Sequence, residues 1–436
     1  MEQTTPQTLV RGIGRWDLVA LTINIIIGAG IFGLPSRIYG LTGAWSILAY
    51  VVCALLTVLI ILCFAEVGSR FDATGGPYLY TRTAFGSVVG FEVGWLVWLA
   101  RVTAFAALCN LFLGYLSFFW PAASVGWTRA AVIVAIVVIL TTVNILGVRE
   151  AAFVSNLFTV GKLAPLLLFV IAGLFFLSPQ QFAAPVAPSY EDFSTAVLLL
   201  VFAFSGFEMA VIPSGEIRDP QRHLAFGLLM GTGFVVLLYI LIQVVCIGTL
   251  PGLASSERPL VDAGSRFLGT AGASIITVGA LISVGGTLNT IMLAGPRLLF
   301  ALAEQGDLPR ALAATHPRFR TPYIAILLSS VIMLVLTLQG TFISALTIST
   351  VIRLLAYVAT CLALPVLRRQ LGVAPFRAPV GVVVAIAASL LSGWLLSNSS
   401  WSDARAVGLA AALGWLIFLA YRMTRNLPSD AEFKRE

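Results

Sequence analysis

The chain has 436 residues, of which 59% are hydrophobic and 10% are charged, and its formal net charge is +7. A soluble globular protein carries about 25% charged residues, which keep its surface in water. The composition therefore excludes a mostly solvent-facing chain. The positive charge does not indicate nucleic-acid binding, because the basic residues lie in short segments between apolar runs and form no stripe interleaved with aromatic residues.

Apolar runs of about 20 residues, long enough to cross a hydrocarbon layer, recur along the whole sequence. They predict an all-α polytopic membrane protein with about twelve transmembrane helices, near residues 17–39, 43–69, 88–119, 128–147, 151–177, 195–215, 225–250, 271–302, 322–339, 342–367, 379–397 and 404–421. The polar start from Met1 to Arg15 predicts that no signal peptide is cleaved. All cysteines lie within apolar runs and predict core positions rather than disulfides or a metal site.

Lys and Arg residues are distributed unequally between the two sides of the predicted helices. With the N-terminus in the cytoplasm, eighteen of them face the inside, five face the outside and three (Arg101, Lys162 and Arg353) lie within spans. Cytoplasmic loops are the ones enriched in Lys and Arg. We therefore expect a multi-pass protein of the cytoplasmic membrane with both termini in the cytoplasm.

Glycine and polar residues interrupt two of the predicted spans. The first contains Gly28, Ala29 and Gly30, and the sixth contains Ser205 and Gly206. Glycine inside a helix costs about 1 kcal/mol relative to alanine, and an unwound segment persists in a membrane only where protein or a cavity covers its backbone. Free N–H groups at a half-helix N-terminus suit a carboxylate, and free carbonyls at a C-terminus suit an ammonium. Close helix packing explains one such segment, but two at matching positions favour a site for a zwitterion.

Five segments in the same order resemble the amino acid–polyamine–organocation (APC) superfamily. Residues 28–32 are similar to that family's first-helix break, and residues 204–208 are similar to its sixth-helix break. Residues 75–80 and 84–86 are similar to the loop after the second helix, residues 216–220 to the loop after the sixth, and residues 296–298 and 305–309 to the loop after the eighth. The resemblance extends from about residue 16 to about residue 322.

The resemblance implies a single transporter domain over residues 1–436 with a LeuT-like fold. Two inverted repeats of five helices, near 16–178 and 193–369, precede two extra helices near 378–424. It implies a permease or exchanger that moves amino acids by alternating access and binds them at the two breaks, with Phe202 in the place of an aromatic lid. The implied substrate-binding residues are Ile27, Gly28, Ala29, Gly30, Ile31, Phe202, Phe204, Ser205, Gly206 and Phe207.

Lys162 is one of only two lysines in the chain and lies in the fifth predicted span. Eleven residues beyond Ala151, at 1.5 Å per residue, it lies roughly 16 Å along the helix, near the middle of a layer about 30 Å thick. An ammonium at that depth indicates function, although snorkelling toward the interface is the alternative. By resemblance to sodium-independent members, Lys162 takes the place of the second sodium ion. The eighth span also lacks an adjacent Ser/Thr pair, with Ser283 and Thr287 isolated, and this argues against sodium coupling.

Other polar residues within the spans leave several interpretations open. Glu208 could bond the unwound backbone, titrate during transport or attract a cationic substrate. Arg101 and Arg353 could line a cavity or pair with acids, and Asn110 and Asn289 could face the substrate. We expect small neutral L-amino acids because no second acid lies near the breaks, with cationic amino acids or polyamines as the alternative.

Function classes other than transport find less support in the sequence. A membrane-embedded enzyme would need a constellation of titratable groups, whereas both histidines, His223 and His316, lie in predicted loops. A channel would show repeated pore segments or charged rings, and the sequence contains neither. We expect no cofactor and no metal; membrane lipid and the substrate are the expected partners. Protons as a coupling ion, uniport, exchange and oligomeric state are left open by the sequence.

Overall fold

The computed structural model describes residues 14–28, 30–71, 76–147, 151–183, 186–211 and 220–425, with side chains described except at 151–160, 220–222 and 424–425. These residues form helices and connecting turns, without a strand among them. The all-α class expected from the sequence is confirmed.

The helices follow one another along the chain with short connections. They are α1 (Arg15–Ile26), α2 (Gly30–Gly33), α3 (Pro35–Thr42), α4 (Ser46–Gly68), α5 (Pro77–Phe85), α6 (Ser87–Leu116), α7 (Gly126–Leu146), α8 (Ala151–Gly173), α9 (Tyr190–Phe204), α10 (Phe207–Ala210), α11 (Pro220–Thr249), α12 (Pro259–Glu304), α13 (Tyr323–Gln339), α14 (Phe342–Leu371), α15 (Gly381–Ser397) and α16 (Trp401–Arg425).

Within the described part of the chain, nine helical segments are long and apolar enough to cross a membrane, and three shorter apolar helices accompany them. The shorter three are Gly161–Phe176, Tyr323–Gln339 and Gly381–Ser397. Together they correspond to the predicted spans. The prediction of a polytopic α-helical membrane protein is confirmed, while the repeat boundaries remain a prediction.

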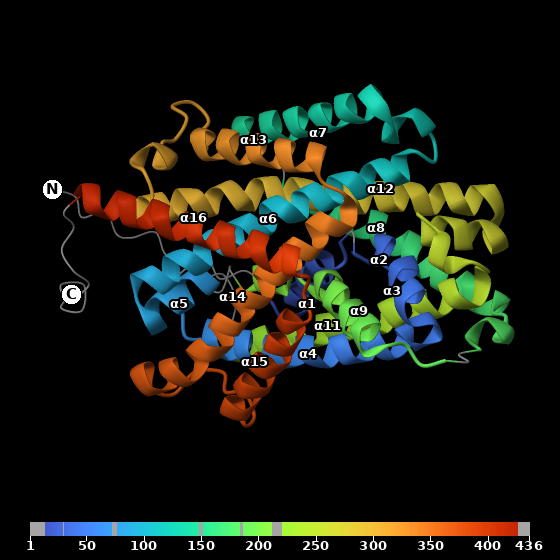
Figure 1. The fold of residues 1–436 in the computed structure, drawn as a ribbon, viewed down its shortest axis with the longest axis horizontal. Helices are drawn as coiled ribbons and strands as arrows, with labels where there is room; N and C mark the ends of the chain where they lie inside the picture. Colours follow the sequence, from blue (N-terminus) through green and yellow to red (C-terminus); the bar gives the residue numbers. More distant parts are fainter. Residues whose placement is uncertain are drawn as a thin grey trace.

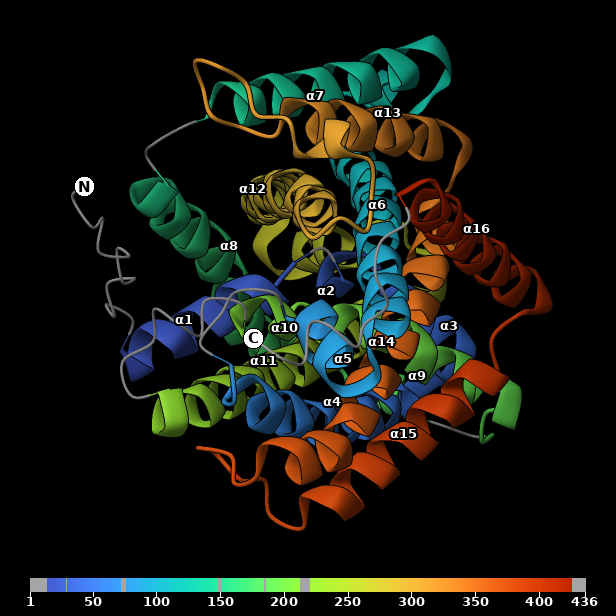
Figure 2. The same ribbon diagram turned by 90° about the vertical axis from the view of Figure 1, so that its left-hand side faces the viewer.

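The central elements are the two short helices α2 and α10, with longer helices around them (Figure 2). Helix α12 packs against α6 and α8, α6 packs against α14, and α1 packs along α11. Helices α7 and α13 lie side by side along one edge of the molecule, and α15 and α16 lie at other edges (Figures 1 and 2). The interrupted helices are therefore the inner part of the bundle.

The peripheral helices expose apolar side chains. Val138 and Ile139 of α7 are 55% and 60% exposed, and Leu409 and Leu416 of α16 are 65% and 57% exposed. Lipid tails solvate such side chains, whereas water does not. These faces are the expected lipid contacts of a membrane-spanning bundle.

Residues 70–86, which we expected to be a loop, contain the helix α5. Its ends are set by Gly76 (φ 56°), which precedes Pro77, and by Gly86 (φ 90°). Proline favours the first helical position, and both glycines adopt a left-handed conformation that other residues avoid. The expectation of a loop was wrong over this stretch, because Pro77 at the first helical position and the two flanking glycines start and stop a helix here.

Helix α5 is tied to the segment after α12 by a polar cluster. Arg82 forms an ion pair of 2.6 Å with Asp307, and the Tyr78 hydroxyl donates a hydrogen bond of 3.0 Å to the same carboxylate. Burial, followed by the nearby carboxylate, raises the pKa of Tyr78, so the phenol stays protonated and remains a donor. The cluster joins two segments that the sequence places more than 200 residues apart.

Candidate functional site

The first break follows Ile26, where the helical hydrogen-bond ladder of α1 ends. Ile27 has a non-helical ψ of 85°, Gly28 donates to the Ile26 carbonyl at 2.7 Å, and α2 starts at Gly30. Gly30 packs so closely on α9 that an added Cβ would lie 2.6 Å from the Cα of Ala203. A side chain has no room there, so glycine is required at Gly30 by packing.

The second break separates α9 from α10 at Ser205 and Gly206. Gly206 adopts φ 113°, in the left-handed region, and a Cβ at this position would lie 3.0 Å from the carbonyl oxygen of Ile25. The Ser205 hydroxyl donates to the Phe202 carbonyl at 2.8 Å. Both breaks predicted from glycine and polar residues are present, and they lie against each other.

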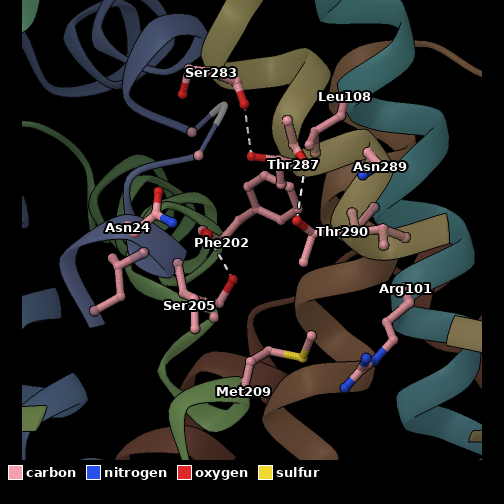
Figure 3. A pocket seen from close by; sticks show the side chains of 18 of the residues that line it. Asn24, Arg101, Leu108, Phe202, Ser205, Met209, Ser283, Thr287, Asn289 and Thr290 are labelled. Carbon is pink, nitrogen blue, oxygen red and sulfur yellow. Dashed lines mark hydrogen bonds between the residues drawn. The ribbon is translucent and has the colours of Figure 1, made fainter. Parts of the chain in front are cut away.

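A cavity of about 340 Å³ lies beside the two breaks. Its walls come from α1 and α2, α6, α8, α9 and α10, α12 and α14. The residues that line it are Asn24, Ile25, Ile26, Gly28, Gly30, Arg101, Ala104, Leu108, Lys162, Phe202, Ser205, Gly206, Glu208, Met209, Ser283, Gly286, Thr287, Asn289, Thr290, Ile291, Leu293 and Arg353. Figure 3 shows Phe202 projecting between Asn24 of α1 and the Thr287 and Thr290 side chains of α12.

Lys162 extends from α8 to the carbonyl end of α1. Its Nζ donates hydrogen bonds to the carbonyl oxygen of Asn24 and, at 3.0 Å, to that of Ile27. The residue is 4% exposed, so it does not snorkel to a membrane surface. From α11, the Tyr239 hydroxyl donates to the Ile26 carbonyl at 3.1 Å. Side chains of two other helices thus satisfy the carbonyls that α1 loses by ending in the bundle interior.

Glu208 holds the amide end of α10 and is itself held by α14. One carboxylate oxygen accepts hydrogen bonds from the Gly206 N–H at 2.8 Å and from the Tyr357 hydroxyl at 2.9 Å. The other oxygen forms an ion pair with Arg353. The carboxylate is therefore fully engaged by protein groups and neutralises the guanidinium of Arg353.

The α12 wall of the cavity carries small hydroxyl and amide side chains. Thr287 Oγ1 donates to the carbonyl of Ser283 at 2.9 Å, and Asn289 accepts a hydrogen bond of 3.1 Å from Asn144 of α7 (Figure 3 shows the first of these contacts). Asn110, the other asparagine considered in the sequence, is not on the cavity wall. Its amide accepts from Arg129 at 2.7 Å and donates to the Ala106 carbonyl at 2.9 Å.

The residues implied for substrate binding divide into two groups in the structure. Those on the cavity wall are Gly28, Gly30, Phe202, Ser205 and Gly206, and the two coupling candidates Lys162 and Glu208 also lie there. Those buried outside the wall are Ile27, Ile31, Phe204 and Phe207. Ala29 lies outside the described residues, as does most of the expected loop at 216–220.

Two buried aromatic residues next to the breaks pack away from the cavity. Phe204 contacts Tyr50 and Tyr239, with ring centroids 6.2 and 5.4 Å apart, and Phe207 contacts Tyr357 at 5.3 Å. Residues at a broken helix alternate between cavity and core, and sequence order alone does not say which face is which.

Sequence reasoning missed several wall residues, above all Asn24, Met209, Gly286 and Thr290. It also missed the tyrosines that brace the breaks, Tyr239 and Tyr357. Asn24 and Thr290 are polar residues inside apolar spans, and this position could have identified them as candidates for the cavity wall. Nothing in the sequence distinguishes Tyr239 or Tyr357 from other buried tyrosines.

Comparisons with known proteins agree with this architecture. A model of the amino acid permease family matches residues 13–419. The chain is 29% identical over 425 residues to the serine/threonine exchanger SteT of Bacillus subtilis, covering 94% of this chain and 96% of that protein. It is 26% identical over 450 residues to the methylthioribose transporter of Bacillus subtilis (98% and 96% covered) and 26% identical over 439 residues to the b(0,+)-type amino acid transporter 1 of Mus musculus (95% and 89% covered). The resemblance to the APC superfamily is confirmed: the chain belongs to the amino acid permease family, whose members are membrane transporters and not enzymes.

Proposed function

We propose that this protein is a sodium-independent secondary transporter that carries amino acids across the cytoplasmic membrane by alternating access. One observation carries the sodium independence. The Lys162 ammonium donates to the carbonyls of Asn24 and Ile27 at the first break, where a bound cation would otherwise coordinate them. A covalently attached charge leaves no site for a dissociable ion at these carbonyls.

The substrate's backbone groups bind at the two breaks. The carboxylate lies against the N–H groups at the start of α2, near Gly28 and Gly30, and the ammonium lies near the carbonyl end of α9 at Phe202. Both glycines and Phe202 line the cavity, which supports this assignment. Main-chain groups recognise any amino acid, so the side chain of the substrate is selected by the remaining walls.

The alternative of a cationic amino acid or polyamine loses its support at Glu208. That carboxylate was the counter-charge which such a substrate would need, and it already accepts from Arg353, Tyr357 and Gly206. A cationic substrate would also approach the guanidinium of Arg101. We therefore propose amino acids with non-cationic side chains.

The experiment that tests this proposal is amino acid uptake into sodium-free proteoliposomes. We expect wild-type uptake without sodium and no stimulation when sodium is added. In Lys162→Ala, each unsatisfied carbonyl costs about 1–3 kcal/mol, and uptake should fall tenfold or more. Lys162→Arg keeps the positive charge but replaces the compact ammonium with a planar guanidinium, so it separates the effect of charge from the effect of donor geometry. Uptake that requires sodium, or an alanine variant as fast as wild type, would contradict the proposal.

We propose further that both termini face the cytoplasm, as the Lys and Arg distribution predicts. All five native cysteines are buried, so an impermeant thiol reagent in intact cells should report only an introduced cysteine. We expect Pro428→Cys to stay unmodified until the cells are permeabilised. Rapid labelling of that variant in intact cells would reverse the orientation.

A further inference from the structure

Arg101 is a buried residue that has no role in the proposed binding of the substrate's carboxylate and ammonium at the two breaks. The side chain projects from the middle of α6 into the cavity (Figure 3) and is 8% exposed. Among the residues that the structure describes, none forms a hydrogen bond or an ion pair with it. A charge in a membrane interior normally has a partner, and where it has none it indicates a ligand pathway.

The acid nearest to Arg101 on the cavity wall does not serve as that partner. Glu208, Arg353 and Tyr357 line, together with Arg101, a second and much smaller cavity of about 10 Å³. Glu208 has both oxygens occupied by Arg353, Tyr357 and the Gly206 amide. Two guanidinium groups therefore share one end of the site with a single carboxylate, and that end has an excess positive charge.

The part of α6 that carries Arg101 lies next to α12 and α14. An added Cβ on Gly295 of α12 would lie 3.9 Å from the Cβ of Arg101, so a small residue faces the stem of this side chain. On the other side, Ser349 of α14 donates to the Ala100 carbonyl at 2.7 Å. The side chain of Arg101 lies on the cavity wall, and the planar donors of a guanidinium match a carboxylate in a bidentate geometry.

We infer that Arg101 forms a subsite for a second anionic group and that the substrates include amino acids with a carboxylate in the side chain. This inference rests on the proposed amino acid transport and replaces the small neutral class expected from the sequence. The α-carboxylate binds at the first break, and the side-chain carboxylate binds Arg101. The sequence shows how few acids lie near the breaks but not which base has no acid partner among the described residues.

The test measures uptake of L-glutamate, L-aspartate and their amides L-glutamine and L-asparagine into proteoliposomes containing the full chain. We expect the wild type to prefer each acid over its amide. In Arg101→Gln, the loss of a charge-assisted hydrogen bond should reduce the apparent affinity for the acids roughly 10- to 100-fold and leave that for the amides unchanged or higher. Arg101→Lys retains the charge without the bidentate guanidinium, so its apparent affinity for the acids should lie between those of the wild type and Arg101→Gln.

The matched control is Arg266→Gln, which removes one positive charge from an exposed position on α12 outside the cavity. It should retain the wild-type preference. Size-exclusion profiles and uptake of an amide show that the Arg101 variants are folded. Uptake of neutral amino acids with no uptake or competition by the acids would overturn this inference and leave the proposed function intact. Absence of uptake for every amino acid in wild type would overturn both, and an equal loss for acids and amides in Arg101→Gln would make Arg101 a structural residue.

Discussion

At each of the two helix breaks, a charged side chain binds backbone groups that have lost their helical partners, and the two charges are opposite in sign. At the first break the orphan groups are carbonyls of α1, and the donors Lys162 and Tyr239 come from α8 and α11. At the second break the orphan group is the Gly206 amide, and the acceptor is Glu208 from the next residues of the same helix. A helix ends in partial negative charge at its carbonyl end and partial positive charge at its amide end. A cation at one break and an anion at the other follow from that polarity.

The two breaks also differ in which backbone end the protein's own side chains take. The amide end of α10 is capped by its own Glu208, which α14 holds in place. At the first break, Lys162 of α8 and Tyr239 of α11 donate to the carbonyl side. The amides at the start of α2 therefore suit a substrate carboxylate, whereas at the second break Glu208 takes the amide side and the carbonyl end of α9 is the part proposed for the substrate ammonium.

Glu208→Gln should have the largest effect on stability. The change keeps the shape and an acceptor for Gly206 but leaves the Arg353 guanidinium without its counter-charge. Removing one partner of a buried pair costs about 3–5 kcal/mol. Thermal unfolding of the purified protein in detergent should show a strong destabilisation. Glu304→Gln, an exposed acid at the end of α12, is the control; equal unfolding temperatures for the two variants would mean that Glu208 is no scaffold.

Alanine at Gly206 should reduce stability, whereas alanine at Gly28 should reduce the apparent affinity for substrate. Gly206→Ala forces a side chain into φ 113° and against the Ile25 carbonyl, which costs about 1–3 kcal/mol of stability. At Gly28 an added Cβ would lie 3.6 Å from Thr287, an ordinary contact, so Gly28→Ala should fold normally. Its methyl group lies where the substrate carboxylate approaches, and apparent affinity should decrease. Thermal unfolding and uptake kinetics on both variants check the contrast, and it fails if Gly28→Ala is the less stable of the two.

Removing one hydroxyl from each break gives the smallest and most closely matched comparison. Tyr357→Phe removes a donor to a carboxylate, and Tyr239→Phe removes a donor to a neutral carbonyl. Hydrogen bonds to charged groups contribute about 1.5–3 kcal/mol, and neutral ones contribute about 0.5–1.5 kcal/mol. We expect the unfolding temperature to drop further for Tyr357→Phe. The reverse order would mean that the Ile26 carbonyl depends on the Tyr239 hydroxyl more than the Glu208 carboxylate depends on that of Tyr357.

The sequence by itself determined the class of fold, the positions of both breaks and the choice of Lys162 as a lysine inside a span, which the structure shows to be buried. Apolar run length, glycine placement and the rarity of lysine are local properties, and the membrane makes each of them restrictive because lipid satisfies no polar group. Partner choice was decided only by the tertiary structure. Glu208 and Arg353 are 145 residues apart in the chain, and no local feature indicates that they meet while Arg101 has no hydrogen-bond or ion-pair partner among the described residues. Such pairing depends on the angles and registers at which α6, α10 and α14 pack, and these are set by the whole bundle.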